Sequence, residues 1–443
     1  MIDVLRSSWA LLLGMMLLMV GNGLQGSLMG VRGGIEGFST FELSLITSAY
    51  FIGFLGGSRL APTFIQRVGH VRVFAALGSF ISAVLILYPA ITDPWAWMAL
   101  RVIFGFCISG VYVTAESWLN NASSNETRGQ ALSAYMVVQM AGIVAAQGLL
   151  NVADPAGYIL FIIPSVLVSI AFAPILLSVT PTPAFGSTRQ MSFRDLYKVS
   201  PLGVVGMFLL GGVFSAQFGM SAVYGTEAGL SVAQISIFVS SIFVGALVLQ
   251  VPIGWLSDRM DRRLLILAAA AIAGVAALLA WAFSDVFAVL LACAFVIGGM
   301  TNPLYALLIA YTNDYLDPDD MAGASGGLLF INGLGAIAGP VVTGWLMTEL
   351  GPRGFWLIIA ATMIATAIYA AYRMTRRQSA FAEEDDYDAV PYAPVGMGST
   401  PVMVEYAQEY YVEAAEEIAE AAEEAAEEAA LEEASATNAQ VNG

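Results

Sequence analysis

The segment G-W-L-S-D-R-M-D-R-R, residues 254–263, is the starting point for reading the rest of this chain. Five formal charges fall within the six residues from Asp258 to Arg263, and long, mostly apolar stretches lie on both sides. Unpaired charges are costly in hydrocarbon, whereas a stretch of roughly twenty apolar residues can span it as a helix. The segment therefore predicts a short turn at a membrane surface, and its arginines place that surface on the cytoplasmic side.

A weaker copy of this segment, R-V-G-H-V-R at residues 67–72, lies 192 residues earlier, with Gln66 in the position of Asp258. Other identical or similar residues recur at an offset of 193: Tyr112 and Tyr305, Asn120 and Asn313, Gln139 and Asn332, and Gly142 and Gly335. Two related loops and four pairs in one register predict a duplicated membrane fold. Transporters built from internal repeats place their binding site between the repeats.

The 254–263 loop resembles the loop signature of the major facilitator superfamily, in which a glycine is followed by Asp-Arg and two further basic residues. Asp261 stands where that family usually has glycine. The segment from Arg101 to Gly105 resembles the R-x-x-x-G pattern of the family's fourth helix. The strings A-E-S-W-L-N at 115–120 and P-L-Y-A-L at 303–307, with Asn313-Asp314, resemble a poorly characterised bacterial, YcaD-like branch.

The resemblance covers residues 1–377 and implies an all-α integral membrane fold. The expected architecture has twelve transmembrane helices arranged as two pseudo-symmetric six-helix bundles. From the apolar stretches alone we place the spans near 9–31, 42–64, 71–91, 96–118, 130–151, 157–178, 199–222, 231–254, 264–283, 286–310, 323–347 and 355–373.

Four segments follow from this reading. Residues 1–178 form the N-terminal bundle, 179–198 a central cytoplasmic linker, 199–377 the C-terminal bundle, and 378–443 an acidic tail. The tail repeats Ala-Ala-Glu-Glu and sets like charges at i,i+4, so we expect it to be a disordered, solvated cytoplasmic spacer.

Composition excludes several classes of protein. Of the 443 residues, 58% are hydrophobic and 12% are charged, which is far from the composition of a soluble domain. The net charge of −17 belongs to the tail, because the 17 basic residues and the other half of the 34 acids balance in the body. Two cysteines in apolar stretches and one histidine make no disulfide or metal pattern. We therefore expect no cofactor, no catalytic residue, no metal and no nucleic-acid partner.

The loop charges predict the orientation. Thirteen basic residues fall in loops on one side of the predicted spans, whereas only Arg32 and Arg353 fall on the other. The excess of arginine and lysine marks the cytoplasmic side. We expect a multi-pass protein of the plasma (inner) membrane with both termini in the cytoplasm, and a monomer.

Polar residues near mid-membrane are the candidate substrate contacts. A buried amide is costly unless it is paired, so each of these groups needs a protein partner, water or ligand. The single charge well inside a span, Arg101, would either bind an anion directly or hold an outer gate through Glu42. The candidate cavity set is Asn22, Gln25, Arg101, Tyr112, Gln139, Gln217, Asn302, Tyr305 and Asn332.

A second set is predicted to act in gating. The family resemblance implies that Glu116 pairs with loop arginines such as Arg67 or Arg72, and we expect Asp258 to hold the halves together at the cytoplasmic surface. The complete gating set is Gly254, Asp258, Arg259, Arg262, Arg263, Arg67, Arg72, Glu116 and Glu42.

The sequence thus predicts a secondary transporter that moves a small solute by alternating access. No Asp, Glu or His lies near mid-membrane, and the predicted cavity offers amides, tyrosines and one cation, which favours a neutral polar or anionic solute. The alternative is a non-transporting membrane sensor or scaffold that acts through the acidic tail. An enzyme ranks third, because no nucleophile–base arrangement is visible.

Overall fold

The computed structural model describes residues 2–122, 125–177, 191–316, 318–376, 392, 395–396, 399–409 and 413, and this part of the chain contains helices and no strands. Its helices are α1 (Ile2–Ile35), α2 (Thr40–Val68), α3 (His70–Ala90), α4 (Pro94–Ala122), α5 (Asn125–Leu149), α6 (Ile159–Leu177), α7 (Phe193–Val199), α8 (Pro201–Ser215), η1 (Ala216–Met220), α9 (Ser221–Glu227), α10 (Val232–Ser257), α11 (Arg262–Phe283), α12 (Phe287–Asn313), α13 (Pro318–Leu350) and α14 (Gly354–Met374).

The predicted spans correspond to these helices. The seventh span is built from α8, the π-helical turn η1 and α9, which follow one another without a break. Within the described residues, eleven helices are long and apolar enough to cross a membrane. The sixth predicted span corresponds to α6, which has 19 residues and a shorter described apolar stretch. The expected all-α membrane fold is confirmed.

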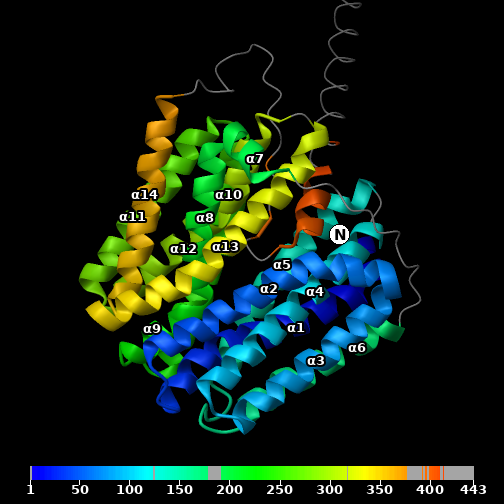
Figure 1. Cartoon of the computed structure of the whole chain (residues 1–443), viewed down its shortest axis with the longest axis vertical. Coiled ribbons are helices and arrows are strands. Elements are labelled where there is room, and N and C mark those ends of the chain that lie inside the picture. The colour runs from blue at the N-terminus through cyan, green and yellow to red at the C-terminus, as the bar shows by residue number, and fades with distance from the viewer. Residues whose placement is uncertain are drawn as a thin grey trace, which may run out of the picture.

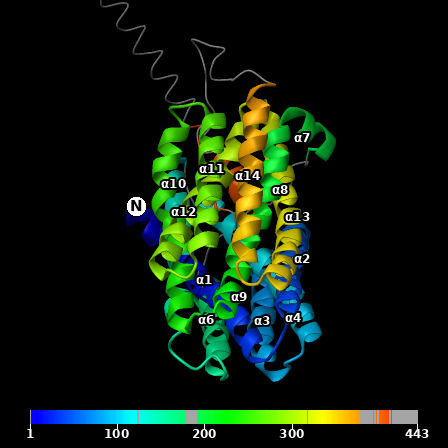
Figure 2. The same cartoon turned by 90° about the vertical axis from the view of Figure 1, so that its left-hand side faces the viewer.

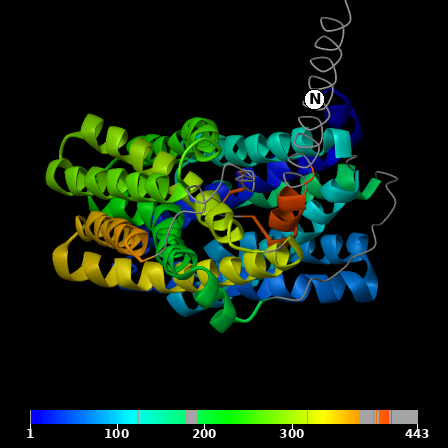
Figure 3. The same cartoon turned by 90° about the horizontal axis from the view of Figure 1, so that it is seen from above.

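The helices form two bundles with matching packing (Figure 1). In the first bundle α2 packs on α4, α1 on α5 and α3 on α6, and in the second α10 packs on α12, α8 on α13 and α11 on α14. Between the bundles, α2 packs on α13 and α5 on α10. Figure 2 and Figure 3 show the two bundles from the side and from above. The repeat seen in the sequence therefore corresponds to two bundles in which equivalent helices pack against each other.

The second helix of each bundle, α2 and α10, begins with the same kind of N-terminal cap. Ser39 caps α2 in a capping box with Glu42, and Ser231 caps α10 in a capping box with Gln234. In each box the serine side chain accepts from a backbone N–H of the first turn, and the Glu or Gln side chain accepts from the serine N–H. The two boxes lie 192 residues apart, the spacing of the two loop copies.

Glycines let the paired helices approach closely in both bundles. A Cβ on Gly53 of α2 would overlap the carbonyl oxygen of Val102 on α4. In the second bundle a Cβ on Gly245 of α10 would overlap the carbonyl oxygen of Phe295 on α12. These crossings need glycine because backbone atoms occupy the space of a side chain.

Gly53→Ala is expected to destabilise the protein by about 1–3 kcal/mol, because the methyl group must push α2 and α4 apart. The matched control is Gly56→Ala on the same helix, where a Cβ would lie 3.7 Å from the Phe106 ring, an ordinary contact. That change should be neutral or stabilising, since alanine favours helix over glycine. Thermal unfolding of both purified variants measures the difference, and equal midpoints would contradict the close crossing.

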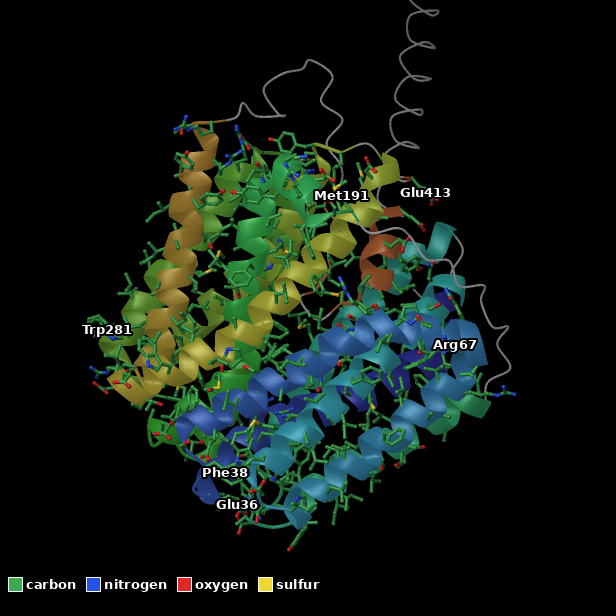
Figure 4. All side chains as sticks on the ribbon, viewed as in Figure 1. Glu36, Phe38, Arg67, Met191, Trp281 and Glu413 are labelled. Carbon is green, nitrogen blue, oxygen red and sulfur yellow. The ribbon has the colours of Figure 1, made fainter. Side chains whose placement is uncertain are left out.

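The two ends of the molecule differ. We call the end where α7 and the loops α2–α3 and α10–α11 lie the linker end, and the opposite end the far end; Figure 4 labels Met191 at the first and Glu36 at the second. At the far end the halves touch. Thr40 Oγ1 donates to Glu227 Oε1 at 3.0 Å, and Ser48 Oγ donates to the Ile337 carbonyl at 2.8 Å.

The predicted linker and tail, which lie between and after the two bundles, are described only in part. Of the predicted linker 179–198, residues 179–190 lie outside the described part, and α7 occupies the rest, with Ser192 as its N-cap. Most of the predicted tail 378–443 also lies outside it.

The described tail residues correct the expectation of a solvated spacer. Residues 401–409 form a helix that lies between α13 and the N-terminal bundle (Figure 3). Its inner face is apolar, as is part of the segment before it, and the buried apolar side chains are Tyr392, Val395, Met403, Val404, Tyr406 and Ala407. The sequence signal for this packing is the cluster of apolar residues that precedes the glutamate repeats.

Candidate functional site

A cavity of about 800 Å³ lies between the two bundles and is lined by both. Along α2 it extends from Tyr50 to Gln66, about 24 Å at the helical rise of 1.5 Å per residue. Along α13 it extends from Ala336 to Ala322, again toward the linker end. The cavity therefore reaches from mid-membrane to the linker end, while the halves meet at the far end.

Six of the nine predicted cavity residues line this space: Asn22, Tyr112, Gln139, Gln217, Asn302 and Asn332. Gln25, Arg101 and Tyr305 are buried and lie outside the lining.

The N-terminal half contributes a linked polar group near mid-membrane. Asn22 Nδ2 donates to the Tyr112 hydroxyl at 3.0 Å, and the Tyr50 hydroxyl reaches Asn22 Oδ1 at 3.4 Å. The Tyr112 hydroxyl in turn donates to Met19 Sδ at 3.1 Å. Three helices, α1, α2 and α4, thus fix these polar groups at one wall of the cavity, and pairing lowers the cost of burying them.

Gln139 is the exception on this wall. Its side chain is buried on α5 beside Tyr135, and its Nε2 makes no hydrogen bond of normal geometry in the described part of the protein. An unpaired buried amide N–H is costly and is therefore a candidate donor to a ligand or water.

The C-terminal half presents amides from three spans. Gln217 lies in the π-helical turn η1, where the local extra residue changes the direction of the side chain, and its Nε2 donates to Thr301 Oγ1 at 3.1 Å. Asn302 Nδ2 donates to Gln250 Oε1 at 2.6 Å. Asn332 Nδ2 donates to the Met207 carbonyl at 3.0 Å, which leaves its Oδ1 as the remaining acceptor.

Arg101 has a role within the N-terminal bundle. It is 2% exposed, donates from Nη1 to Gln25 Oε1, and places its guanidinium carbon 5.4 Å from the centroid of the Tyr50 ring. Glu42 instead accepts from the N–H and the hydroxyl of Ser39, both at 2.8 Å. The expected Arg101–Glu42 outer gate is therefore absent from this conformation, because Glu42 caps α2 while Arg101 is held one layer behind the cavity wall.

The cation that the cavity does present is Arg59, which the sequence reading did not place in the site. Arg59 lines the cavity from α2, and its guanidinium carbon lies 3.7 Å from the centroid of the Phe330 ring on α13. Among the described lining residues of the body it is the one with a formal charge. Arg59 lies four residues after Leu55, another lining residue, and residues at i and i+4 share one face of a helix.

The 254–263 loop is held by ion pairs. Arg262 is 3% exposed, pairs with Asp314 at the end of α12 and has Asp258 Oδ1 3.8 Å from Nη2. Arg263 Nη2 lies 2.7 Å from Asp261 Oδ2. This explains the departure from the family pattern at Asp261, whose side chain also caps α11 by accepting from the Arg263 N–H at 2.9 Å.

The other predicted gating residues lie in different surroundings. Arg259 is at the surface, with its guanidinium carbon 4.3 Å from the centroid of the Trp255 ring. Arg67 and Arg72 are exposed at the linker end of the first bundle; Figure 4 labels Arg67. Gly254 packs against Tyr392 of the tail, since a Cβ there would lie 2.7 Å from the ring.

Glu116 corrects the predicted pairing with Arg67 or Arg72. It is fully buried on α4, and its two carboxylate oxygens are used by hydroxyl donors. The Tyr135 hydroxyl donates to Oε1 at 2.7 Å, and the Thr400 hydroxyl donates to Oε2. The partner from outside the bundle is therefore a tail residue, 284 positions away in the chain.

Within the described residues no group of three or more His, Cys, Asp or Glu side chains is arranged to hold a metal ion. Cys107 and Cys293 are both buried and unpaired with each other.

The structure consists of two similarly packed helical bundles around a cavity that is closed at one end. This arrangement is typical of polytopic membrane proteins that are built from repeats and bind a solute between their halves. The family model described as Major Facilitator Superfamily matches residues 11–232 and 202–403. The chain belongs to the major facilitator superfamily; it is a multi-pass membrane transporter and not an enzyme.

Relatives support the branch suggested by the sequence strings. An uncharacterised transporter of the superfamily from Yersinia pestis is 25% identical over 350 residues, covering 77% of this chain and 89% of the relative. Uncharacterised transporters named YcaD from Escherichia fergusonii and Salmonella arizonae are 25% and 24% identical, covering 74% and 73% of this chain and 85% and 84% of the relatives.

Solved structures share the fold. A mutant of the nucleoside transporter NupG superposes with a TM-score of 0.71 at 15% identity, covering 83% of this chain and 99% of the other. A bacterial homologue of the human lysosomal transporter Spinster, inward-facing and unoccupied, gives a TM-score of 0.64 at 14% identity, covering 93% and 98%. At these identities the likeness concerns the fold alone.

Proposed function

We propose that this protein is a secondary transporter that carries a small neutral polar or anionic solute across the plasma (inner) membrane by alternating access, with the linker end and both termini in the cytoplasm. The observation that supports it most is a cavity shared by both halves, which touch at the far end, and extending to the linker end. Rocking of the two bundles about a central site would expose it to each side in turn.

The chemistry of the lining supports the class of solute. Amides and hydroxyls surround the middle of the cavity, and the charge contributed by the body is the Arg59 guanidinium. A cationic solute would meet no body carboxylate in the described lining and would bear most of its desolvation cost uncompensated. Neutral polar solutes can bind the amides, and anions can in addition reach Arg59.

The gating role of the 254–263 loop is part of the proposal. In the conformation described here Asp258 is at the surface, where its Oδ1 accepts from the Tyr392 N–H at 3.0 Å. When the linker end closes, Asp258 would be released to hold the two halves together there. The protein is proposed to act as a monomer.

A ligand screen tests the proposed class. The purified full chain is heated with a panel of carboxylates, sugars, nucleosides and quaternary amines, because a ligand that binds the folded state raises the unfolding midpoint. Solutes that stabilise are then assayed for counterflow in vesicles. Stabilisation and flux by neutral or anionic solutes are expected. Selective stabilisation and flux by the amines would overturn the class, and binding without flux of any hit would favour the sensor alternative.

Replacing both Gln139 and Asn332 by leucine is expected to abolish binding of the hit from that screen and to leave the unfolding midpoint within a few degrees. Gln139 Nε2 makes no hydrogen bond of normal geometry in the described structure, and the Met207 carbonyl that accepts from Asn332 lies within helix α8. The unliganded protein therefore loses little, whereas the ligand loses its polar contacts. The control is Gln147→Leu on the same helix, whose side chain bonds Ser27 away from the cavity. Retained binding by the double variant would remove these amides from the site.

A further inference from the structure

The C-terminal tail places a segment of the same chain inside the cavity. Ser399, Pro401, Val402, Glu405 and Glu409 all contribute to the lining, together with residues of both bundles. Figure 1 shows this orange-to-red segment between α13 and the helices of the N-terminal bundle, at the linker end. The cavity is therefore shared by the body and by an internal occupant.

The occupant is anchored to both halves. On the N-terminal half, Thr400 donates its hydroxyl and its N–H to Glu116, the latter at 3.3 Å. On the C-terminal half, Gln408 Nε2 donates to Ser325 Oγ at 2.5 Å, and the Tyr392 N–H donates to Asp258. A segment bonded to both bundles at the open end holds them at a fixed separation.

The anchor at Glu116 is specific in its chemistry. A fully buried carboxylate needs donors, and within the bundle Tyr135 supplies one of them at Oε1. Thr400 supplies the donors at Oε2, since both its side chain and its backbone point to that oxygen. The tail thus satisfies an acceptor that belongs to the transport body.

The charge of the tail segment is opposite to the charge that the body contributes to the cavity lining. The tail brings Glu405 and Glu409 into the cavity whose body lining carries the Arg59 guanidinium. These carboxylates line the same cavity as the cation, so they can compete with an anionic solute for its charge. A tethered segment competes at an effective concentration on the order of millimolar, well above the free concentration of many solutes.

We propose that the described tail residues, 392, 395–396 and 399–409, belong to a tethered plug that occupies the linker-side mouth of the cavity and inhibits transport. The plug both blocks entry and, by bonding to each half, prevents the linker end from closing. This inference rests on the proposed transport function for its effect on flux, but the occupancy itself can be measured without any substrate.

The test uses the full chain with substitutions confined to the tail. Thr400→Glu places a second carboxylate against Glu116 and should expel the plug, and Met403→Asp should do so through a buried apolar position. Thr400→Ser keeps the hydroxyl donor and is the matched control. The reporter is Ser58→Cys on the cavity wall, in a background with Cys107 and Cys293 replaced by alanine.

The probe is a polar maleimide, applied to purified protein in detergent. Relative to the parent and to Thr400→Ser, the labelling rate of the reporter should rise at least tenfold in Thr400→Glu and Met403→Asp. A cysteine at Tyr197, an exposed residue of α7 outside the cavity, should react equally in all of them. Equal rates at the Ser58 reporter with and without the expelling changes would overturn the plug.

Flux separates this inference from the proposed function. Faster counterflow of a screened solute in Thr400→Glu than in Thr400→Ser supports inhibition by the plug. Faster labelling with no flux in any variant would retain the occupant and refute transport. Unchanged labelling with measurable, equal flux would retain transport and refute the plug.

Discussion

Asp314→Asn is expected to lower the free energy of unfolding by about 3 kcal/mol, because it leaves the Arg262 guanidinium buried without its principal carboxylate. Arg262 is 3% exposed, and the Asp314 side chain is 4% exposed, so water cannot replace the lost partner. The pair joins the start of α11 to the end of α12. Chemical or thermal unfolding of the purified variant in detergent measures the loss.

Asp258→Asn is the matched control for that experiment. Asp258 also faces Arg262, but at 3.8 Å and with its side chain 44% exposed, so solvent screens the interaction. Pairs of this kind contribute about 0–1 kcal/mol. A loss in Asp258→Asn as large as in Asp314→Asn would show that burial does not decide the strength of these two pairs.

Arg59→Gln is expected to weaken binding of an anionic solute by about tenfold to a hundredfold, which corresponds to the loss of one charge-assisted hydrogen bond. Arg59→Lys should retain most of the binding to a compact anion, since the charge remains. A neutral solute should be affected much less by either change. Titration of ligand-dependent stabilisation with the solutes of the screen gives the affinities.

The control for Arg59 lies on the same helix. Arg67→Gln removes an exposed cation eight residues further along α2, outside the cavity lining, and should leave affinity unchanged. If both variants weaken anion binding equally, the effect comes from the net charge of the linker end and Arg59 has no specific role. If neither does, anions bind away from Arg59.

The positions of the spans were readable from the sequence because their physical cause is local. A stretch of about twenty apolar residues can be inserted as a helix without reference to its neighbours. The duplication was readable for a related reason, since the loop recurs 192 residues apart and four residue pairs recur at an offset of 193. The capping boxes of Ser39 and Ser231, found in the structure, share the 192-residue spacing. The amides of the cavity, such as Gln139 and Asn332, were found because a polar group within an apolar stretch is conspicuous.

The tertiary structure decided which of these polar groups share a space. Arg101 and Arg59 are both arginines within predicted spans, yet Arg101 is bonded to Gln25 behind the wall while Arg59 lines the cavity. The direction in which a side chain points depends on the rotation of its helix within the bundle, and helix–helix packing sets that rotation. The amphipathic signal is weak where both faces of a helix contact apolar surroundings, so the sequence offers little to fix it.

The position of the tail also depended on tertiary contacts that the sequence does not reveal. Its glutamate repeats are a compositional signal and predicted a solvated segment, whereas the few apolar residues around Tyr406 pack into the body. Their binding site is made by Glu116, Ser325 and Asp258, which come from three distant parts of the chain. By itself the sequence determined a twofold repeated set of membrane helices with polar residues inside, because hydrophobicity acts locally. Only the packed structure decided where the cavity lies and what occupies it, because those depend on contacts between residues hundreds of positions apart.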